Sequence, residues 1–302
     1  MSGSLISIVV PTVSTNKSKI VALLRSLSVQ TYRNFEVILV ADKKDIAPSF
    51  PEVGLAVYTS SGGASMARNV GARASKGSVL AFLDDDVVLD RTWCEMAATT
   101  FVNPSVGAVS GKTLLAQTRF DYTPPALRWA IGATYWASGD TIDVVGAAGM
   151  NFCVSKKVFE DVGGYDETLG PTGEKPELLN WRRPGAEEID LAIRIIESGH
   201  RVLYNPLMVA THLVGNQSLT PSSMMKRAMH VGHNRAIISR RNRRYVKMNN
   251  HLVLRNVSIG MARDLFHLAK NPFDTWRKFS FTMFILVGVA FGWVFGILDD
   301  SR

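Results

Sequence analysis

Three consecutive acids follow the apolar run VLAFL and are the first candidates for chemistry: Asp84, Asp85 and Asp86. The run predicts a buried strand, and like charges at its end repel one another unless a cation or water neutralises them. If the backbone stays extended, Asp84 and Asp86 point to one face and Asp85 to the other. Two carboxylates on one face favour Mg²⁺, Mn²⁺ or Ca²⁺ over Zn²⁺. The competing interpretation is that the acids are solvated turn residues that cap a helix expected near Arg91.

A second group of acids opens the segment AEEIDLAIRIIESGH: Glu187, Glu188 and Asp190. The apolar residues of this segment fall on one helical face, so the acids occupy the first turn of a helix, where the macrodipole favours negative charge. That placement alone can explain them. The functional interpretation is that one of them is a general base for an incoming hydroxyl.

One histidine, His212, ends the strand-like segment VLYNPLMVATH. A lone histidine is most often a satisfied surface or core residue. The competing interpretation is that its imidazole joins the aspartates as a ligand to the same cation.

Apolar runs and helical patterns alternate in the first third of the chain and would position these residues. ISIVV ends at Pro11 and Thr12, a helical pattern covers residues 17–28, and FEVILVAD forms a second apolar run that ends at Asp42. LAVYTS, SMARNVGARASK and SVLAFL then predict a strand, a helix and the strand before the acids. Such alternation predicts a parallel sheet with crossover helices, which binds ligands at the carboxyl ends of its strands. Thr12, Asp42 and the three acids therefore belong to one edge.

The middle of the chain, GAAGMNFCVSKKVFEDVGGYDETLG, predicts a strand at FCV, a short helix and a Gly-Gly turn. Small residues at 146–149 would let a bulky ligand approach the backbone. The later loop GPTGEKPELLNWRRPG is long and rich in Gly and Pro. It is either a solvated loop or a lid that closes on a sugar or diphosphate through Trp181 and Arg182.

Composition bounds the class of protein. The chain has 302 residues, 46% hydrophobic and 20% charged, which allows a substantial core and excludes a disordered chain. MSGSL leads directly into the first apolar run, so no signal segment is expected. The spacing of Cys94 and Cys153 indicates neither a zinc site nor a disulfide framework, which leaves buried reduced thiols.

Positive charge is concentrated near the C-terminus. The chain carries +8, but residues 220–278 hold 13 Lys and Arg against 2 acids, a net +11, and the remainder carries −3. A basic segment can meet nucleic acid, but this one leads to FSFTMFILVGVAFGWVFGIL at 279–298, which has no charge and is long enough to cross a bilayer as a helix. A buried C-terminal helix is the alternative. We therefore expect a membrane, and no nucleic acid, as the partner of this region.

The charges around the apolar segment predict its orientation. Two cations precede it and two acids follow it, so the positive-inside rule places a single C-terminal span in the cell membrane with the main body facing the cytoplasm. Upstream, residues 224–247 mix Met and Ile with many cations, which is typical of a helix at an anionic lipid surface; a solvated basic helix is the alternative. Arg235 in this segment is also a candidate contact for a diphosphate or a lipid phosphate.

Six of these pieces, in this order, resemble the family 2 glycosyltransferases. They span residues 5–212 and are ISIVVPT, FEVILVADKKD, ARNVGARASKG, FLDDDV, VFEDVGGYDETL and AEEIDLAIRIIESGHRVLYNPLMVATH. The resemblance implies a GT-A fold, an α/β domain that binds a nucleotide sugar on a mostly parallel central sheet. The expected organisation is a catalytic domain at 1–215, a basic juxtamembrane helical segment at 216–278, a transmembrane helix at 279–298 and a tail at 299–302.

The resemblance implies donor binding by one group of residues. The positions of Thr12 and Asp42 are those at which the family contacts the nucleobase and ribose, and Arg68 and Asn69 fall in the segment that closes over the nucleotide. The candidate set for nucleotide or donor binding is Pro11, Thr12, Asp42, Arg68, Asn69, Asp84 and Asp85.

The resemblance also implies a metal site and a base. Asp84 and Asp86 occupy the two ends of the family's DxD motif, where Asp86 corresponds to a ligand of Mg²⁺ or Mn²⁺ and Asp84 lies nearer the ribose. His212 matches a late metal-binding histidine. Glu188 matches the base of the family's ED-x-D pattern, in which Asp190 is the last acid, and Glu187 remains the alternative base.

Together these features predict a metal-dependent, inverting glycosyltransferase. Its expected donor is a UDP- or GDP-type sugar, and its expected acceptor is a hydroxyl or phosphate of a lipid-linked molecule or growing glycan at the membrane. Two alternatives come from other classes. A DxD phosphohydrolase of the haloacid dehalogenase kind would hydrolyse simple phosphate esters without an acceptor, and a non-catalytic membrane scaffold would retain the fold without transferring sugar.

Overall fold

The structure is a computed structural model of the whole chain. It describes residues 3–12, 17–43, 50, 52–116, 139–144, 146, 149–171, 185–213 and 221–242, together with the helical positions 280, 283, 284, 286, 287, 289, 290, 291 and 294.

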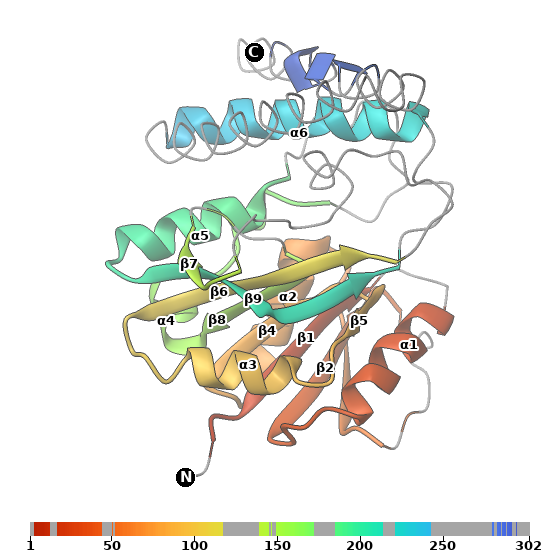
Figure 1. Cartoon of the computed structure of the whole chain (residues 1–302), viewed down its shortest axis with the longest axis vertical. Coiled ribbons are helices and arrows are strands. Elements are labelled where there is room, and N and C mark those ends of the chain that lie inside the picture. Colours follow the sequence, from red (N-terminus) through yellow and green to blue (C-terminus); the bar gives the residue numbers. More distant parts are fainter. Residues whose placement is uncertain are drawn as a thin grey trace.

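A nine-stranded mixed sheet forms the centre of the molecule (Figure 1), with the strand order β3-β2-β1-β4-β8-β6-β9-β5 and β7 paired to β9. The strands are β1 Ile6–Thr12, β2 Phe35–Ala41, β3 Leu55–Thr59, β4 Val79–Leu83, β5 Val87–Leu89, β6 Val106–Leu115, β7 Ile142–Asp143, β8 Asn151–Ser155 and β9 Arg201–His212. Strands β1 to β4 are parallel, as are β6 and β9, while β8 runs antiparallel between β4 and β6. The predicted α/β fold with a mostly parallel sheet is therefore confirmed.

Helices cover both faces of this sheet. They are α1 Lys17–Ser28, α2 Ala64–Ala74, α3 Trp93–Thr100, α4 Lys156–Asp161, α5 Glu187–Glu197 and α6 Pro221–Arg241. The buried residues of α1 and α3 pack in one core cluster, and those of α2, α4 and α5 pack in another. Because burial of apolar surface drives this packing, the two clusters fix each helix against its own face of the sheet.

The carboxyl ends of the strands meet at one edge of the sheet. Strand β1 ends at Thr12 beside Ala41 of β2, and β4 runs parallel to β1. Strand β9 runs in the same direction as β4, because β8 is antiparallel to both β4 and β6 and β6 is parallel to β9. His212 at the end of β9 therefore lies at the same edge as the acids that follow β4, as the sequence predicts.

The sequence pattern does not predict three of the strands. Strand β5 has only three residues and follows the acids without a break, and β7 has two. Strand β6 contains Gly107, Ser110 and Gly111, which interrupt its apolar pattern, yet its first six residues are buried. Pairing with β8 and β9 on either side overrides its weak local preference for a strand.

Strand β9 contains a bulge that the side chain of Asn151 supports. Residues 206–208 stand out of register with β6. The Asn151 amide donates to the backbone oxygens of Lys112 at 3.2 Å and Met208 at 3.1 Å, and its Oδ1 accepts a hydrogen bond from Trp93 Nε1 at 2.8 Å. This buried amide thus satisfies polar groups that the bulge would otherwise leave unpaired.

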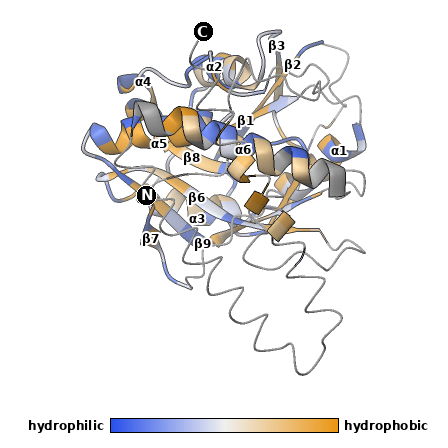
Figure 2. Cartoon of the chain, turned by 90° about the horizontal axis from the view of Figure 1, so that it is seen from above, coloured by the Kyte–Doolittle hydropathy of each residue, from blue (hydrophilic) through white to orange (hydrophobic). Residues whose placement is uncertain are grey.

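Helix α6 lies beyond α5 on the side away from the sheet (Figure 1) and falls within the predicted basic segment 216–278. Hydrophilic and hydrophobic residues alternate along it (Figure 2). The predicted span at 279–298 lies mostly outside the described residues. Within the part of the chain that the structure describes, no helix combines the length and apolar composition needed to cross a membrane.

Candidate active site

The acidic triplet forms a turn and does not continue strand β4. Asp84 follows β4 directly, and Asp85 and Asp86 lie in the turn before β5. Asp84 consequently contacts α2 on one face of the sheet, while Asp86 contacts α1 on the other. The shared face expected of Asp84 and Asp86 depended on an extended backbone through the triplet, and the turn removes that condition.

Asp86 lies between two basic side chains. Lys19 Nζ of α1 is 3.0 Å from Asp86 Oδ2, and His212 Nε2 is 3.4 Å from Asp86 Oδ1. Partial burial acts to raise the pKa of Asp86, but the hydrogen bonds and charges of His212 and Lys19 outweigh it and hold this pKa below its usual range. Asp86 is therefore a charged carboxylate at neutral pH, and the structure brings it together with His212.

The ends of β1 and β2 form the part of the sheet's carboxyl edge that lies next to the acidic turn. The Thr12 hydroxyl donates a short hydrogen bond to the Asp85 carboxylate. Burial raises the pKa of Asp85, and the bond from Thr12 acts against this rise. Pro11 is half-buried in β1, and Asp42 is exposed in the bend after β2. These four predicted donor-binding residues thus lie along the edge made by β1, β2 and β4.

Arg68 of α2 is the centre of a buried group of charges. Its guanidinium nitrogens lie 3.2 Å from Asp84 Oδ1, 2.9 Å from Glu187 Oε1 and 3.5 Å from Glu188 Oε1. The Tyr165 ring centroid is 5.4 Å from its Cζ. Burial disfavours the charge on Arg68, but the surrounding acids outweigh this effect and raise its pKa. Arg68 therefore links the acidic turn to the two candidate bases.

The two glutamates that open α5 have different surroundings. The Glu187 side chain is 5% exposed and makes the shorter ion pair with Arg68, whereas the Glu188 side chain is 15% exposed. Burial, and then the charge of Glu187, raise the pKa of Glu188 to about 8, while Arg68 acts against this rise. A carboxyl that titrates near neutral pH is suited to accept a proton.

A glycine makes room for the Glu188 carboxylate. A Cβ atom on Gly149 would overlap the Glu188 side chain. We predicted that the small residues at 146–149 admit a bulky ligand to the backbone. At Gly149 the structure instead places the candidate base against the backbone, two residues before β8.

Asn69 hydrogen-bonds to the loop that follows α4 and does not face the carboxyl edge of the sheet. Its Nδ2 donates to the Tyr165 backbone oxygen at 2.9 Å and to Glu167 Oε1 at 3.0 Å, and its Oδ1 accepts from the Tyr165 backbone nitrogen at 3.0 Å. Both ends of the amide are thus used by the loop that follows α4. The effect on the site is indirect, because this loop positions the Tyr165 ring beside Arg68.

Asp190 is not brought to the candidate bases. Its Oδ2 is 2.8 Å from the Arg194 guanidinium one turn further along α5. Arg194 also donates to the Val162 backbone oxygen at 2.6 Å. Asp190 therefore stabilises the packing of α5 beside α4, and its prediction as a catalytic residue has no geometric support. Trp181 and Arg182 lie outside the described residues, and Arg235 lies in α6 with its side chain outside them.

A divalent cation would find two protein ligands at Asp86 and His212. No group of three or more His, Cys, Asp or Glu side chains forms a metal site among the described residues. Two ligands still fit Mg²⁺ or Mn²⁺, which commonly complete their shell with water and substrate phosphates. Within the described part of the chain, His212 Nδ1 is buried without a hydrogen-bond partner. The Lys19 ammonium already places a positive charge beside Asp86, as a metal ion would.

Sequence reasoning missed Lys19, Tyr165 and the ion pairs of Arg68 with the bases. Lys19 lies in the first turn of α1, and the helix after β1 points its start toward the carboxyl edge of the sheet, so its position was a usable signal. Tyr165 follows the Gly-Gly turn directly. The ion pair between Arg68 and Glu187 joins residues 119 positions apart, so no local sequence pattern could predict it.

The mixed sheet, with an acidic turn and a buried group of charges at its carboxyl edge, agrees with the sugar-transferring class that the sequence predicts. The chain belongs to glycosyl transferase family 2, because the family model matches residues 7–163, more than half of the chain. The protein is therefore a glycosyltransferase. This membership decides against the phosphohydrolase and the non-catalytic scaffold.

Curated relatives agree with this class. The chain is 25% identical over 290 residues to the glucosyl-dolichyl phosphate glucuronosyltransferase of Haloferax volcanii, with 91% of this chain and 90% of the relative covered. It is 28% identical over 222 residues to the pre-mycofactocin glycosyltransferase of Mycobacterium tuberculosis, covering 68% of this chain and 42% of that protein.

Solved structures share the fold. The mannosyltransferase PcManGT from Pyrobaculum calidifontis, in complex with GDP-Man and Mn²⁺, superposes with a TM-score of 0.62 at 17% identity, covering 97% of this chain and 88% of its own. GalNAc-T7 with UDP, GalNAc and Mn²⁺ gives a TM-score of 0.55 at 17% identity, covering 76% of this chain and 48% of its own. The GT-A-like fold is thereby confirmed.

Proposed function

We propose that this glycosyltransferase transfers a sugar from a nucleoside-diphosphate sugar of the UDP or GDP type to a lipid-linked acceptor at the membrane, with inversion at the anomeric carbon. The observation that carries the proposal is the convergence of three groups at one edge. They are the charged Asp86 beside His212, the Arg68 ion-pair group, and the Glu188 carboxyl.

The donor would bind along the carboxyl edge formed by β1, β2 and β4. Thr12, Asp42 and Asp85 are the polar side chains available there for the nucleoside. Asp86 and His212 would hold Mg²⁺ or Mn²⁺, and the two solved neighbours described above contain Mn²⁺. When bound, the cation supplies positive charge to the leaving diphosphate. Lys19 lies within reach of the same charge.

Glu188 would take the proton from the acceptor. Its side chain is 15% exposed, while Glu187 is held in the tighter contact with Arg68. One base on the acceptor side accounts for inversion, because a single displacement needs no nucleophile from the protein. We therefore assign the base to Glu188 and a supporting charge to Glu187.

The acceptor is proposed to be lipid-linked. The Haloferax volcanii relative is named for a glucosyl-dolichyl phosphate, and it aligns over nearly its whole length. The chain has a net +11 between residues 220 and 278, which favours an anionic lipid surface. Beyond it, Met283, Val287, Phe291 and Val294 are exposed and recur at helical spacing. These features support a membrane-bound enzyme whose single C-terminal span leaves the catalytic domain in the cytoplasm.

The donor side can be tested by calorimetry. We expect GDP or UDP to bind in the presence of Mn²⁺ and much less without it, and Asp86→Ala to abolish the effect of Mn²⁺. Asp161→Ala removes an exposed carboxylate of α4 and is the matched control. Absence of nucleotide binding under every condition would refute the proposed donor class.

The transfer side can be tested with labelled nucleotide sugars and polyprenyl phosphate or polyprenyl-linked sugars in vesicles. We expect the label to enter the lipid fraction, with an inverted anomeric configuration by NMR. Glu188→Gln should abolish transfer and leave nucleotide binding intact. Retained transfer in Glu188→Gln would show that Glu188 is not the base.

A further inference from the structure

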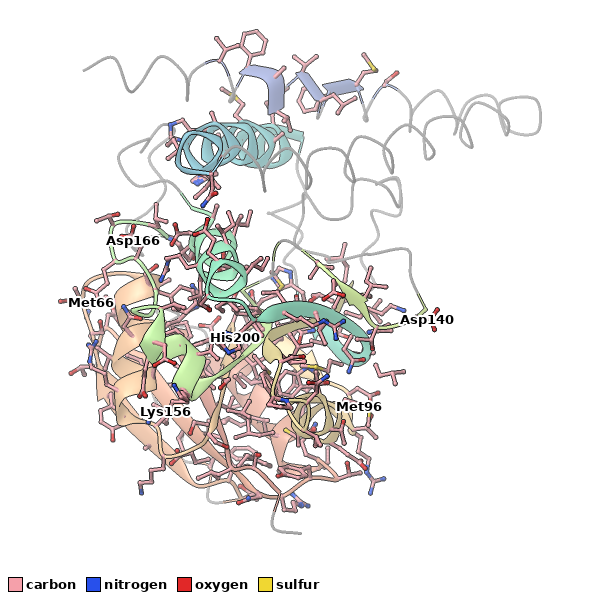
Figure 3. All side chains as sticks on the ribbon, turned by 90° about the vertical axis from the view of Figure 1, so that its left-hand side faces the viewer. Met66, Met96, Asp140, Lys156, Asp166 and His200 are labelled. Atoms are coloured by element: carbon pink, nitrogen blue, oxygen red, sulfur yellow. The ribbon has the colours of Figure 1, made fainter. Side chains whose placement is uncertain are left out.

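Helix α6 packs against α5, the helix that carries Glu188 (Figure 3). Buried Ile238 of α6 lies in one apolar cluster with Leu169 and Ile193. Ala186 and Ile189, which flank the two glutamates, pack against this cluster. Helix α6 therefore shares an apolar cluster with the residues on both sides of the base.

Asn234 of α6 and Asn242, the residue that follows α6, hydrogen-bond near opposite ends of α5. Asn234 Oδ1 accepts a hydrogen bond from the Gly185 backbone nitrogen at 2.9 Å, in a partly buried contact. Asn242 Nδ2 donates to Glu197 Oε1 at 3.2 Å, in an exposed contact. Only the first contact adjoins the candidate bases, because α5 begins two residues after Gly185.

The backbone between Asn234 and the base has an uncommon conformation. Ala186 has φ 72° and ψ 25°, the left-handed region, which is strained for a residue with a Cβ. Such a conformation persists only where the surroundings hold it. A Cβ atom on Gly185 would come within 2.6 Å of Asn234 Nδ2, so the backbone approaches α6 as closely as a glycine allows. The contact with α6 thus holds the residue before the left-handed turn.

We propose that Asn234 is a positioning residue for catalysis. Its hydrogen bond fixes Gly185, the left-handed Ala186 then sets the start of α5, and the first turn presents Glu188 to Arg68 and Gly149. This inference rests on the proposed function, in which Glu188 is the base. It assigns to α6 a catalytic role besides any contact with lipid.

Steady-state kinetics of Asn234→Ala in the full chain test the proposal. We expect kcat to fall about tenfold, which corresponds to about 1.4 kcal/mol in the barrier. The KM for the donor and the Kd for the nucleotide with Mn²⁺ should stay unchanged, because the hydrogen bond of Asn234 is to Gly185 and not to a residue assigned to the donor. Asn234→Asp keeps the acceptor oxygen and should restore most of kcat.

Asn242→Ala is the matched control. It removes the same type of side chain directly after α6 and breaks the hydrogen bond to the other end of α5, but it leaves Gly185 untouched. A purely structural role of α6 would lower the thermal unfolding midpoint in both variants and leave kcat alike in both. Selective loss of kcat in Asn234→Ala supports positioning. If this variant does not fold, Gly185→Ala perturbs the same contact from the other side and should lower kcat selectively.

The inference is overturned if folded Asn234→Ala keeps the wild-type kcat, or if Asn234→Asp turns over no faster than Asn234→Ala. The proposed function fails through a different result, in which Glu188→Gln retains transfer. The combination of an inactive Glu188→Gln and a fully active Asn234→Ala would reject the positioning role alone.

Discussion

At the scale of single residues, the site is a balance of charges around Arg68. The sequence predicted the acids, and it could not predict which of them face each other, because ion pairs between distant segments depend on the packed fold. Arg68 joins Asp84 to both glutamates and is almost fully buried. Removing one partner from such a group leaves an uncompensated charge, so its members act on one another's protonation.

The first prediction concerns the pH dependence of turnover. The pKa of Glu188 is about 8, and only its deprotonated form accepts a proton, so kcat should rise as the pH increases through this value. Glu187→Gln removes a like charge that raises this pKa. The rise should therefore move to lower pH, as measured by kcat profiles at saturating substrates. Glu197→Gln makes the same charge change at the far end of α5 and should leave the profile in place. A shift to higher pH in Glu187→Gln would contradict the prediction.

The second prediction concerns Lys19. Its ammonium is 3.0 Å from Asp86 Oδ2, so an arriving cation must compete with it. We expect Lys19→Ala to bind Mn²⁺ alone about tenfold more tightly by calorimetry, since about 1.4 kcal/mol corresponds to this ratio. Lys17→Ala removes an exposed lysine from the same turn of α1 and should have no such effect. Unchanged or weaker Mn²⁺ binding in Lys19→Ala would show that the two cations do not compete.

At the scale of elements, the sequence predicted most strands and helices that form the site. Pattern, length and order identified β1, β2, β4, β9 and the helices α1, α2 and α5, since each has a continuous apolar run or a clear helical period. It did not predict β5, β6 or β7, whose residues become strands through pairing with neighbours. For Asp84 to Asp86 the sequence left two interpretations open, and the structure has the turn and not the extended backbone.

The third prediction concerns the bulge in β9 that precedes His212. Asn151→Ala would leave Trp93 Nε1 and two backbone oxygens buried without a partner, at about 1–3 kcal/mol each. We expect the free energy of unfolding to fall by about 3 kcal/mol or more in urea titrations. Asn34→Ala removes one exposed hydrogen bond and should change it by less than about 0.5 kcal/mol. A loss of similar size in both variants would mean that the buried amide has no special part in holding the bulge.

At the scale of the whole molecule, the catalytic sheet and the basic C-terminal part have opposite net charges. The sequence gives −3 outside residues 220–278 and +11 within them. Helix α6 joins the two parts, because it belongs to the basic segment and packs on α5. Attraction of the basic segment to anionic lipid would therefore hold the carboxyl edge of the sheet near lipid-linked acceptors.

The last prediction separates a spanning anchor from surface attachment. Surface attachment by Lys and Arg is screened by salt, whereas an apolar segment of about 20 residues stays in the bilayer. We expect the full chain to remain with membranes after washes with high salt and with alkaline carbonate. Val287→Arg places a charge within the apolar segment, at a cost of about 2.5–3.5 kcal/mol, and should release a large fraction. Val29→Arg makes the same change at an exposed position after α1 and should release none. Complete release of the unmodified chain by salt would leave only the basic segment as the membrane contact.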